Sequence, residues 1–173
     1  MLYTLNAPLD FRSGQRQENG AMERTIDIKE SSPDQVPRSL LLEADPSMDR
    51  INRYVTDSVC FIATIGHDVI GVCVLKALSR DRYELFNIAV SPGYQKRGIG
   101  SQLLRYALEA LKERQVNAVE LGTGTFGYQL AFYQRFGFRV DSICRDHFID
   151  EYEEPIYENG IQLRDMLRLV LNL

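Results

Sequence analysis

The segment Gln95–Gly100 places two basic residues and two glycines at the start of a long amphipathic pattern. An apolar run, Leu85–Val90, and a Pro-Gly turn precede it. A strand, a glycine loop and a helix in this order can bind phosphate, because the first N–H groups of a helix lack partners and carry partial positive charge. The glycines let the main chain approach an anion closely, and the lysine and arginine add cationic donors.

The spacing excludes a P-loop, which needs Lys-Ser/Thr after its second glycine, whereas Gly100 is followed by Ser101-Gln102. The pattern that fits is Gln-x-x-Gly-x-Gly after a strand ending in Ala-Val. With Asn87-Ile88-Ala89-Val90, Pro92 and Leu103-Leu104, it resembles the acyl-CoA-binding motif of the GNAT superfamily of N-acetyltransferases.

The resemblance implies that acetyl-CoA is the cosubstrate and that main-chain N–H groups of the loop hold its pyrophosphate. It also implies that the strand end pairs with the pantetheine arm and that an N–H there polarises the thioester carbonyl. The side chains of Ile88 and Val90 can belong to the core at the same time, because this contact uses main chain only. Lys96 and Arg97 could form a solvated basic patch, but their place inside the loop favours phosphate contact. The implied cofactor-binding residues are Ile88, Ala89, Val90, Gln95, Lys96, Arg97, Gly98, Ile99, Gly100 and Ser101.

Glu84 is the candidate general base. An amine with a pKa near ~10.4 is almost entirely protonated at neutral pH, so a proton acceptor beside the cleft is useful. Glu84 begins the strand that bears the motif, where many members of the similar family place a catalytic carboxylate. The alternative is an exposed strand glutamate paired across a hairpin with Arg82 or Lys76, and the sequence leaves both open.

Tyr133 is the candidate general acid. Its segment, Ala131–Phe138, resembles the tyrosine and Gly-Phe signature that follows the cofactor cleft in this superfamily. A phenol of pKa ~10 can protonate a departing thiolate of comparable basicity. The alternative is a helix tyrosine that packs on the sheet. Many members also have an asparagine near the start of this helix, and here only Thr125 or Gln129 could replace it.

A second glycine motif, Gly122–Gly127, fits G-x-G-x-x-G and taken alone would suggest a dinucleotide site. Too few residues follow it to complete a dinucleotide-binding sheet, and Asp141 comes earlier than the ~20-residue offset of that fingerprint. These glycines are therefore expected to let the strand and the next helix diverge, which in the similar family opens the cleft for pantetheine.

The composition is that of an ordinary globular chain, with 45% hydrophobic and 25% charged residues among 173. A net charge of −4 gives no indication of nucleic-acid binding, and no apolar run is long enough to span a membrane. No signal peptide is recognisable, and Cys60, Cys73 and Cys144 lack metal-ligand spacing. We expect a cytoplasmic protein with buried free thiols and no metal.

The domain is expected to span residues 22–173, after an N-terminal extension over 1–21 that could be a leader, vector-derived sequence or a mobile arm. The patterns predict strands at 23–28, 58–65, 69–78, 83–90, 118–123 and 138–149, and helices at 35–43, 49–55, from Gly98 onward and at 128–135. The strands before and after the long helix should be parallel neighbours. The spacing of the tail after Pro155 is too irregular to assign, although ENGIQLRDMLRL resembles the end of a subgroup of bacterial GNAT proteins.

These expectations combine into a GNAT fold of the α/β (α+β) class, a mixed, mostly antiparallel sheet with helices on both faces. The expected function is transfer of an acetyl group from acetyl-CoA to a primary amine of a small molecule or protein, by direct attack in a ternary complex. The alternative is a non-catalytic acyl-CoA-binding or sensing module. The resemblance also suggests a homodimer.

Overall fold

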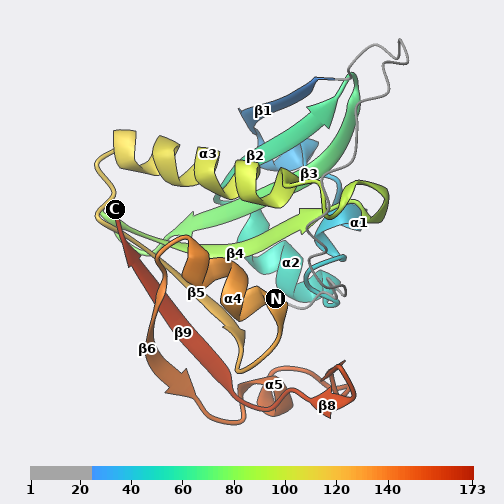
Figure 1. Cartoon of the computed structure of the whole chain (residues 1–173), viewed down its shortest axis with the longest axis vertical. Helices are drawn as coiled ribbons and strands as arrows, with labels where there is room; N and C mark the ends of the chain where they lie inside the picture. The colour runs from blue at the N-terminus through green and yellow to red at the C-terminus, as the bar shows by residue number, and fades with distance from the viewer. Residues whose placement is uncertain (1–24) are drawn as a thin grey trace, which may run out of the picture.

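The computed structural model describes residues 25–173, which build a seven-stranded sheet with the order β1-β2-β3-β4-β5-β9-β6 (Figure 1). The expected extension over 1–21 and the expected domain start at Met22 lie outside these residues. The strands of the sheet are β1 Ile26–Ser31, β2 Ser58–Ile65, β3 Asp68–Ala77, β4 Arg82–Val90, β5 Ala118–Gly124, β6 Arg139–Cys144 and β9 Met166–Asn172. The helices are α1 Arg38–Leu41, α2 Met48–Val55, α3 Ile99–Glu113, α4 Tyr128–Arg135 and α5 His147–Asp150, with 3-10 turns η1 Pro33–Gln35 and η2 Pro92–Tyr94. A small hairpin pairs β7 Tyr157–Glu158 with β8 Ile161–Gln162.

The first half of the sheet is an antiparallel meander, and β4 and β5 are parallel. Strands β1 to β4 pair antiparallel in chain order. The chain then crosses over through α3, and β5 pairs parallel to β4. Both arrangements confirm the predicted mixed sheet.

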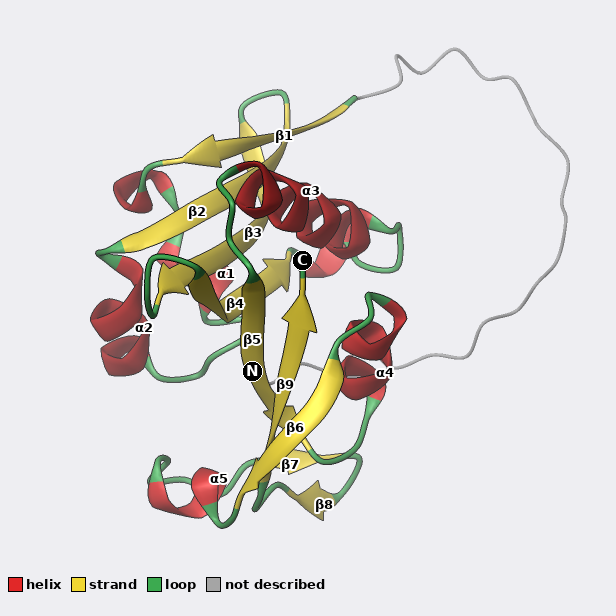
Figure 2. Ribbon diagram, turned by 90° about the vertical axis from the view of Figure 1, so that its left-hand side faces the viewer, coloured by secondary structure: helices red, strands yellow, loops and turns green. Residues whose placement is uncertain are grey.

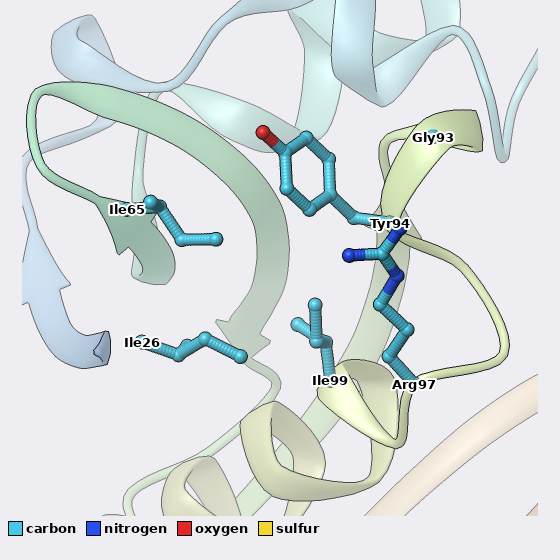
Figure 3. Close-up of a pocket in the computed structure, with 6 residues that line it drawn as sticks. All are labelled: Ile26, Ile65, Gly93, Tyr94, Arg97 and Ile99. Carbon is cyan, nitrogen blue, oxygen red and sulfur yellow. The ribbon is translucent and has the colours of Figure 1, made fainter. Parts of the chain in front are cut away.

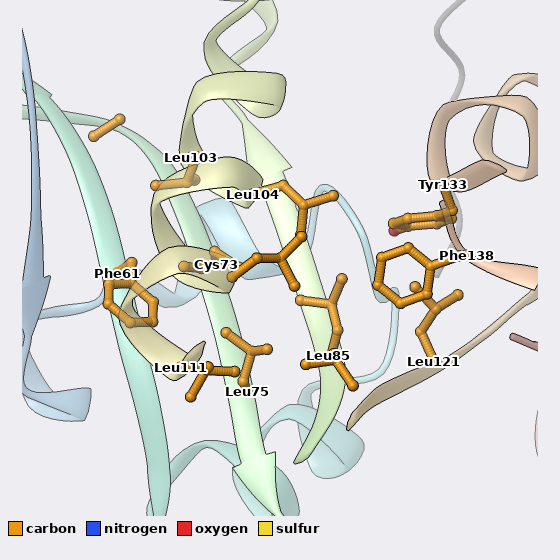
Figure 4. Close-up of a cluster of buried hydrophobic side chains, with 14 of the residues drawn as sticks. Phe61, Cys73, Leu75, Leu85, Leu103, Leu104, Leu111, Leu121, Tyr133 and Phe138 are labelled. Carbon is orange, nitrogen blue, oxygen red and sulfur yellow. The ribbon is translucent and has the colours of Figure 1, made fainter. Parts of the chain in front are cut away.

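The two faces of the sheet carry separate apolar cores. On one face α3 packs its apolar stripe, including Leu103, Leu104 and Leu111, onto β2 to β5 (Figure 4). On the other face, α1 and α2 cover β2 to β4 through Leu41, Ile51 and their neighbours. Figure 2 shows α3 and α2 on opposite sides of these strands. Helices therefore lie on both faces, as predicted.

Two predicted elements are wrong in extent. The helix predicted over 35–43 is a 3-10 turn followed by the four-residue α1, because Pro37 lacks an N–H and a helix can only begin anew after it. The strand predicted over 138–149 ends at Cys144. Asp146 then adopts a left-handed backbone conformation (φ 54°) and begins α5.

The tail contains β9, which the sequence analysis left unassigned. This strand lies between β5 and β6 and pairs antiparallel with both. Leu167 and Leu169 are buried at alternate positions, as expected for a strand. The alternation of buried and exposed residues is too short to predict the strand from the sequence. The insertion makes β9 an interior strand of the sheet.

Candidate functional site

Strands β4 and β5 part in the middle of the sheet. Their pairing ends at Leu85 and Leu121, although β4 continues to Val90 and β5 to Gly124. We call the segments Phe86–Val90 and Gly122–Gly124 the β4–β5 fork. Within residues 25–173, the β4 side of the fork pairs only with β3, so its other edge has no strand partner. The main-chain groups of this edge, apart from the Val90 carbonyl, which accepts a bond from Gln95 Nε2, are therefore available to an extended ligand.

A β-bulge stands at the point where the strands part. Leu85 pairs with Leu75 and Asn87 with Val74, so Phe86 is the extra residue. A bulge bends a strand and redirects its side chains, and bulges are common beside active sites. The ring of Phe86 stacks on Tyr54 of α2, with centroids 5.0 Å apart.

The side chain of Asn87 ties the bulge to the helices above it. Its Nδ2 donates to the carbonyl oxygen of Leu41 (3.0 Å) and to the hydroxyl of Tyr54 (2.9 Å). The residue is fully buried, so both bonds are shielded from water. Asn87 therefore fixes α1 and α2 relative to the fork.

The predicted phosphate loop connects β4 to the N-terminus of α3. Gln95 uses its side-chain Nε2 to donate to the Val90 carbonyl (2.9 Å), which anchors the loop to the strand end. Lys96 (φ 62°) and Gly98 (φ 77°) both adopt left-handed conformations, and α3 begins directly after Gly98. The N–H groups of the first helical turn thus emerge beside the end of β4.

Neither the backbone conformation nor the packing of the chain requires a glycine at position 100. A Cβ built there would lie 3.7 Å from Val90 Cγ2, an ordinary contact, and its φ is not left-handed. The glycine therefore leaves room for something other than the chain. This is the observation expected where a ligand approaches the backbone.

The second glycine motif has a different role. A Cβ at Gly122 would lie 2.3 Å from Met166 Sδ, and one at Gly124 would lie 3.0 Å from Leu163 Cδ2. Gly127 has φ 96°, and a Cβ there would approach the carboxylate of Glu158. The space beside these glycines is filled by the C-terminal segment. These contacts supply a structural reason for the motif, the close packing of the C-terminal segment, that needs no dinucleotide.

Arg97 faces a pocket beside the loop. Its guanidinium lies over the ring of Tyr94, 5.4 Å from the centroid. Both side chains line a pocket of about 590 Å³ together with Ile26 and Ile65 at the ends of the first two strands (Figure 3). The cation of Arg97 thus lies on the side of the loop that faces β1 and β2.

Glu84 has a partner that the sequence analysis did not find. Its Oε1 accepts a bond from Arg168 Nη1 of β9 at 2.5 Å. The suggested pairs with Arg82 and Lys76 are wrong, because Arg82 bonds Glu120 and the Nζ of Lys76 lies 4.0 Å from Asp57. Arg168 was missed because β9 was not predicted.

Tyr133 is part of the core beneath α3. It is 1% exposed, and its ring packs edge-on against Phe138, 5.8 Å between centroids (Figure 4). It also packs edge-on against Phe132, 5.2 Å between centroids. Burial raises the pKa of Tyr133 well above its usual value, so the phenol stays protonated. In the free protein Tyr133 therefore packs on the sheet, which was the alternative to the acid role. Its role as a general acid stays a prediction.

Thr123 has a buried hydroxyl in the fork. The residue is fully buried, and its Oγ1 has no hydrogen-bond partner in the described part of the chain. Such a group is uncommon in folded proteins and costs stability. Sequence patterns give no signal for it, because its neighbours are set by tertiary packing.

All three cysteines are free thiols. Cys60 and Cys73 are buried, whereas Cys144 is half-buried, contrary to the expectation for it. Across residues 25–173 the longest apolar helices are too short or too polar to cross a membrane.

Known proteins are similar to this chain in sequence and fold. The acetyltransferase (GNAT) domain family matches residues 56–140, which include the fork, the glycine loop and Tyr133. YvbK of Bacillus subtilis (strain 168), an uncharacterized N-acetyltransferase, is 42% identical over 149 residues, 86% of this chain and 96% of that protein. The structure of IAA acetyltransferase from Bacillus cereus ATCC 14579 superposes with a TM-score of 0.81 at 44% identity, covering 86% of this chain and 100% of that one. A GNAT family acetyltransferase from Elizabethkingia anophelis with acetyl-CoA bound also superposes with a TM-score of 0.81, at 36% identity over 88% of this chain and 100% of that one.

Proposed function

Because the chain belongs to the GNAT family of N-acetyltransferases, we propose that it binds acetyl-CoA along the β4–β5 fork and transfers the acetyl group to a primary amine. The relative from Elizabethkingia anophelis, whose structure contains acetyl-CoA, supports the choice of cosubstrate. The single observation that carries the proposal is Gly100, where the chain would tolerate a side chain without a clash but has none. This glycine lies between the N–H groups that begin α3 and the edge of β4 that has no strand partner in residues 25–173.

The residues present fit acetyl-CoA. The first turn of α3 and the loop from Gln95 to Ser101 offer main-chain donors for a pyrophosphate, and no acidic side chain stands in that turn. From Val90 back to Phe86 the unpaired edge runs for about 13 Å at ~3.3 Å per residue. An extended arm that pairs with this edge would end at the bulge, beside Glu84.

Bound acetyl-CoA supplies an activated acetyl thioester, whose C–S bond breaks as the new C–N bond forms. Main-chain N–H groups on the free edge of Ile88–Val90 and at the bulge would stabilise the developing oxyanion. Glu84 would take a proton from the acceptor ammonium, and this frees the nitrogen lone pair for attack. Tyr133 would give its phenolic proton to the departing sulfur and recover one from the nitrogen through solvent.

Tyr133 can act in this way only after its covering side chains move, because the phenol is closed off in the free protein. The ring lies against the same core as Leu121 and Leu85, the last paired residues before the fork. Cofactor entry between the strands would therefore reach it.

Thermal unfolding with acetyl-CoA, CoA, NAD or buffer alone tests the proposal. A ligand at one hundred times its dissociation constant adds about 2.7 kcal/mol to the free energy of unfolding. For a chain of this size that raises the Tm by about 5–10 °C. We expect this rise with acetyl-CoA and CoA and none with NAD. A Tm that neither CoA compound changes would refute the proposal.

The acceptor is identified by a second assay. A panel of primary amines, containing a polyamine, an amino acid, an aminoglycoside, a lysine peptide and a peptide with a free N-terminus, is incubated with acetyl-CoA while thiol release is followed. Thiol release that depends on one amine class names the substrate. Sedimentation of the same preparation tests the homodimer that the family resemblance suggests.

A further inference from the structure

Charged side chains from three neighbouring strands meet just before the β4–β5 fork. Glu84 of β4 lies directly opposite Glu120 of β5 in the parallel register. Arg168 of β9 reaches both, with Nη1 2.5 Å from Glu84 Oε1 and Nη2 2.7 Å from Glu120 Oε1. The three side chains are only 17–20% exposed. One guanidinium therefore bridges two strands through two partly shielded carboxylates.

The two carboxylates differ in how many of their oxygens accept hydrogen bonds. The second oxygen of Glu120, Oε2, accepts a bond from Arg82 Nη1 at 3.1 Å, so both of its oxygens are engaged. Across the part of the chain that the structure describes, Glu84 Oε2 accepts no hydrogen bond. Of the pair, only Glu84 keeps an open oxygen that can receive a proton.

We propose that Arg168 is a positioning residue, which holds Glu84 beside the fork with Oε2 open to the ammonium group of the acceptor. This inference rests on the proposed function. The N–H bond of the ammonium breaks, its proton forms an O–H bond with Oε2, and the freed lone pair attacks the thioester carbonyl. Glu120, fixed between Arg82 and Arg168, anchors the guanidinium and keeps its own oxygens occupied.

The guanidinium suits this task for two reasons. Its planar donors can bond two carboxylates in fixed positions, which the point charge of a lysine cannot do as well. It is also charged at every pH at which the protein is folded, and bonds to Glu84 and Glu120 help to keep its pKa raised against the opposing effect of burial. Arg168 thus separates two like charges that would otherwise face each other across adjacent strands.

The other charges that face Glu84 are few. Lys76 of β3 lies opposite Glu84 in the antiparallel register, but its Nζ contacts Asp57 at 4.0 Å and the Arg53 carbonyl of α2 at 3.5 Å. Arg82 of β4, two positions before Glu84, bonds Glu120 at 3.1 Å. Arg168 is therefore the cation that holds the carboxylate of Glu84 in place.

Arg168→Met and Arg168→Lys test the inference in the full chain, with Arg164→Met as the matched control, since Arg164 is an exposed arginine that pairs with Asp146. The ¹³C signal of the Glu84 carboxyl, assigned by comparison with Glu84→Gln, is recorded by NMR at one fixed pH. In Arg168→Met we expect this signal to move, because the carboxylate loses the guanidinium that bonds it. Arg168→Lys should move it less, and Arg164→Met not at all.

Turnover supplies the second measurement, with spermidine and an alanine-terminated peptide as the amine probes. We expect kcat to fall by about tenfold or more in Arg168→Met and by less in Arg168→Lys. The Kd for acetyl-CoA should stay within about twofold, because the side chain of Arg168 bonds two carboxylates that precede the fork. Full turnover in Glu84→Gln, or an unmoved Glu84 signal in Arg168→Met, would overturn the inference.

If Arg168→Met does not fold, Arg168→Lys keeps a cation but loses the planar pair of donors, so it should still move the Glu84 signal and lower kcat; an unmoved signal would contradict the proposed arrangement. If the wild-type chain binds no acetyl-CoA, the proposed function fails. The NMR comparison needs no cofactor and still decides whether Arg168 holds the carboxylate of Glu84.

Discussion

Replacing Gly100 with alanine should leave the free protein folded, and slightly more stable, while it weakens the binding of acetyl-CoA. The structure gives the added methyl group 3.7 Å to its nearest neighbour, Val90 Cγ2, and no left-handed φ opposes it. Alanine is the better helix former by about 0.5–1 kcal/mol, and a position in the first turn gains the lower end of that range. The Tm of the free protein should rise by about 1–2 °C.

The cost to binding follows from the position of the methyl group. It would stand in front of the N–H groups that are proposed to hold the pyrophosphate. A hydrogen bond to a charged group contributes about 1.5–3 kcal/mol, so losing one would weaken acetyl-CoA binding about 10- to 100-fold. At a cofactor concentration that stabilises the wild type by about 2.7 kcal/mol, a tenfold weaker complex is stabilised by only about 1.4 kcal/mol.

Titration calorimetry and thermal unfolding with and without acetyl-CoA measure both effects. Gly93→Ala is the matched control, because a Cβ at Gly93 meets nothing within 4 Å and lies ahead of the helix. Its Kd should equal that of the wild type. Wild-type affinity in Gly100→Ala would show that no ligand approaches this glycine, and a large loss of stability in the free variant would show that the space is not there.

Four other substitutions test separate parts of the site. Tyr133→Phe should lower kcat by about a hundredfold with little change in acetyl-CoA affinity, since a general acid is lost but the ring is kept; unchanged turnover in the amine assay would remove the acid role. Thr123→Val replaces an unpartnered buried hydroxyl and should raise the free energy of unfolding by about 1 kcal/mol in urea titrations, whereas a loss would reveal a hidden partner. Asn87→Leu strips two buried bonds and should cost about 2–3 kcal/mol by the same method; a smaller cost would mean that α1 and α2 are held elsewhere. Burial raises the pKa of Glu158, so the folded chain favours the neutral carboxyl group. The stability that this group contributes below the pKa of the unfolded chain is lost as the pH rises through the pKa of the folded chain. The Tm of Glu158→Gln should therefore rise relative to that of wild type between pH 4 and 8, and a constant difference in Tm would count against this.

The sequence was most informative where the chemistry is local. Gln95, Gly98 and Gly100 lie within six consecutive residues. The strand before them, the turn and the start of the helix each have a recognisable residue pattern in adjacent positions. The hairpin of β2 and β3 and the helix Tyr128–Arg135 follow the same rule, and the structure confirms both. The comparisons likewise confirm the fold and the family.

The parts that were missed depend on long-range contacts. Arg168 meets Glu84 across 84 positions of the chain, and no periodicity records that meeting. Pro37 shortened a helix that the apolar pattern alone extended to Glu43. Gly122 and Gly124 matched a ligand motif, yet their small size serves the packing of Met166 and Leu163 from the tail. A pattern can nominate a glycine, but only the neighbours of its missing side chain decide what the glycine is for.

The position of β9 has a consequence for how the enzyme is made. Among the described strands of the sheet, β6 pairs with β9 alone, yet it is synthesised more than twenty residues earlier. Until β9 emerges, β6 is an open edge bearing Val140 and Ile143, apolar side chains that stay largely exposed even in the folded chain. Arg168 arrives with the same strand, so Glu84 and Glu120 face each other without their shared cation until the last strand of the sheet is in place. The nascent chain can assemble its proposed cofactor loop early, but the proposed proton acceptor is completed only by the final segment of the sheet to leave the ribosome.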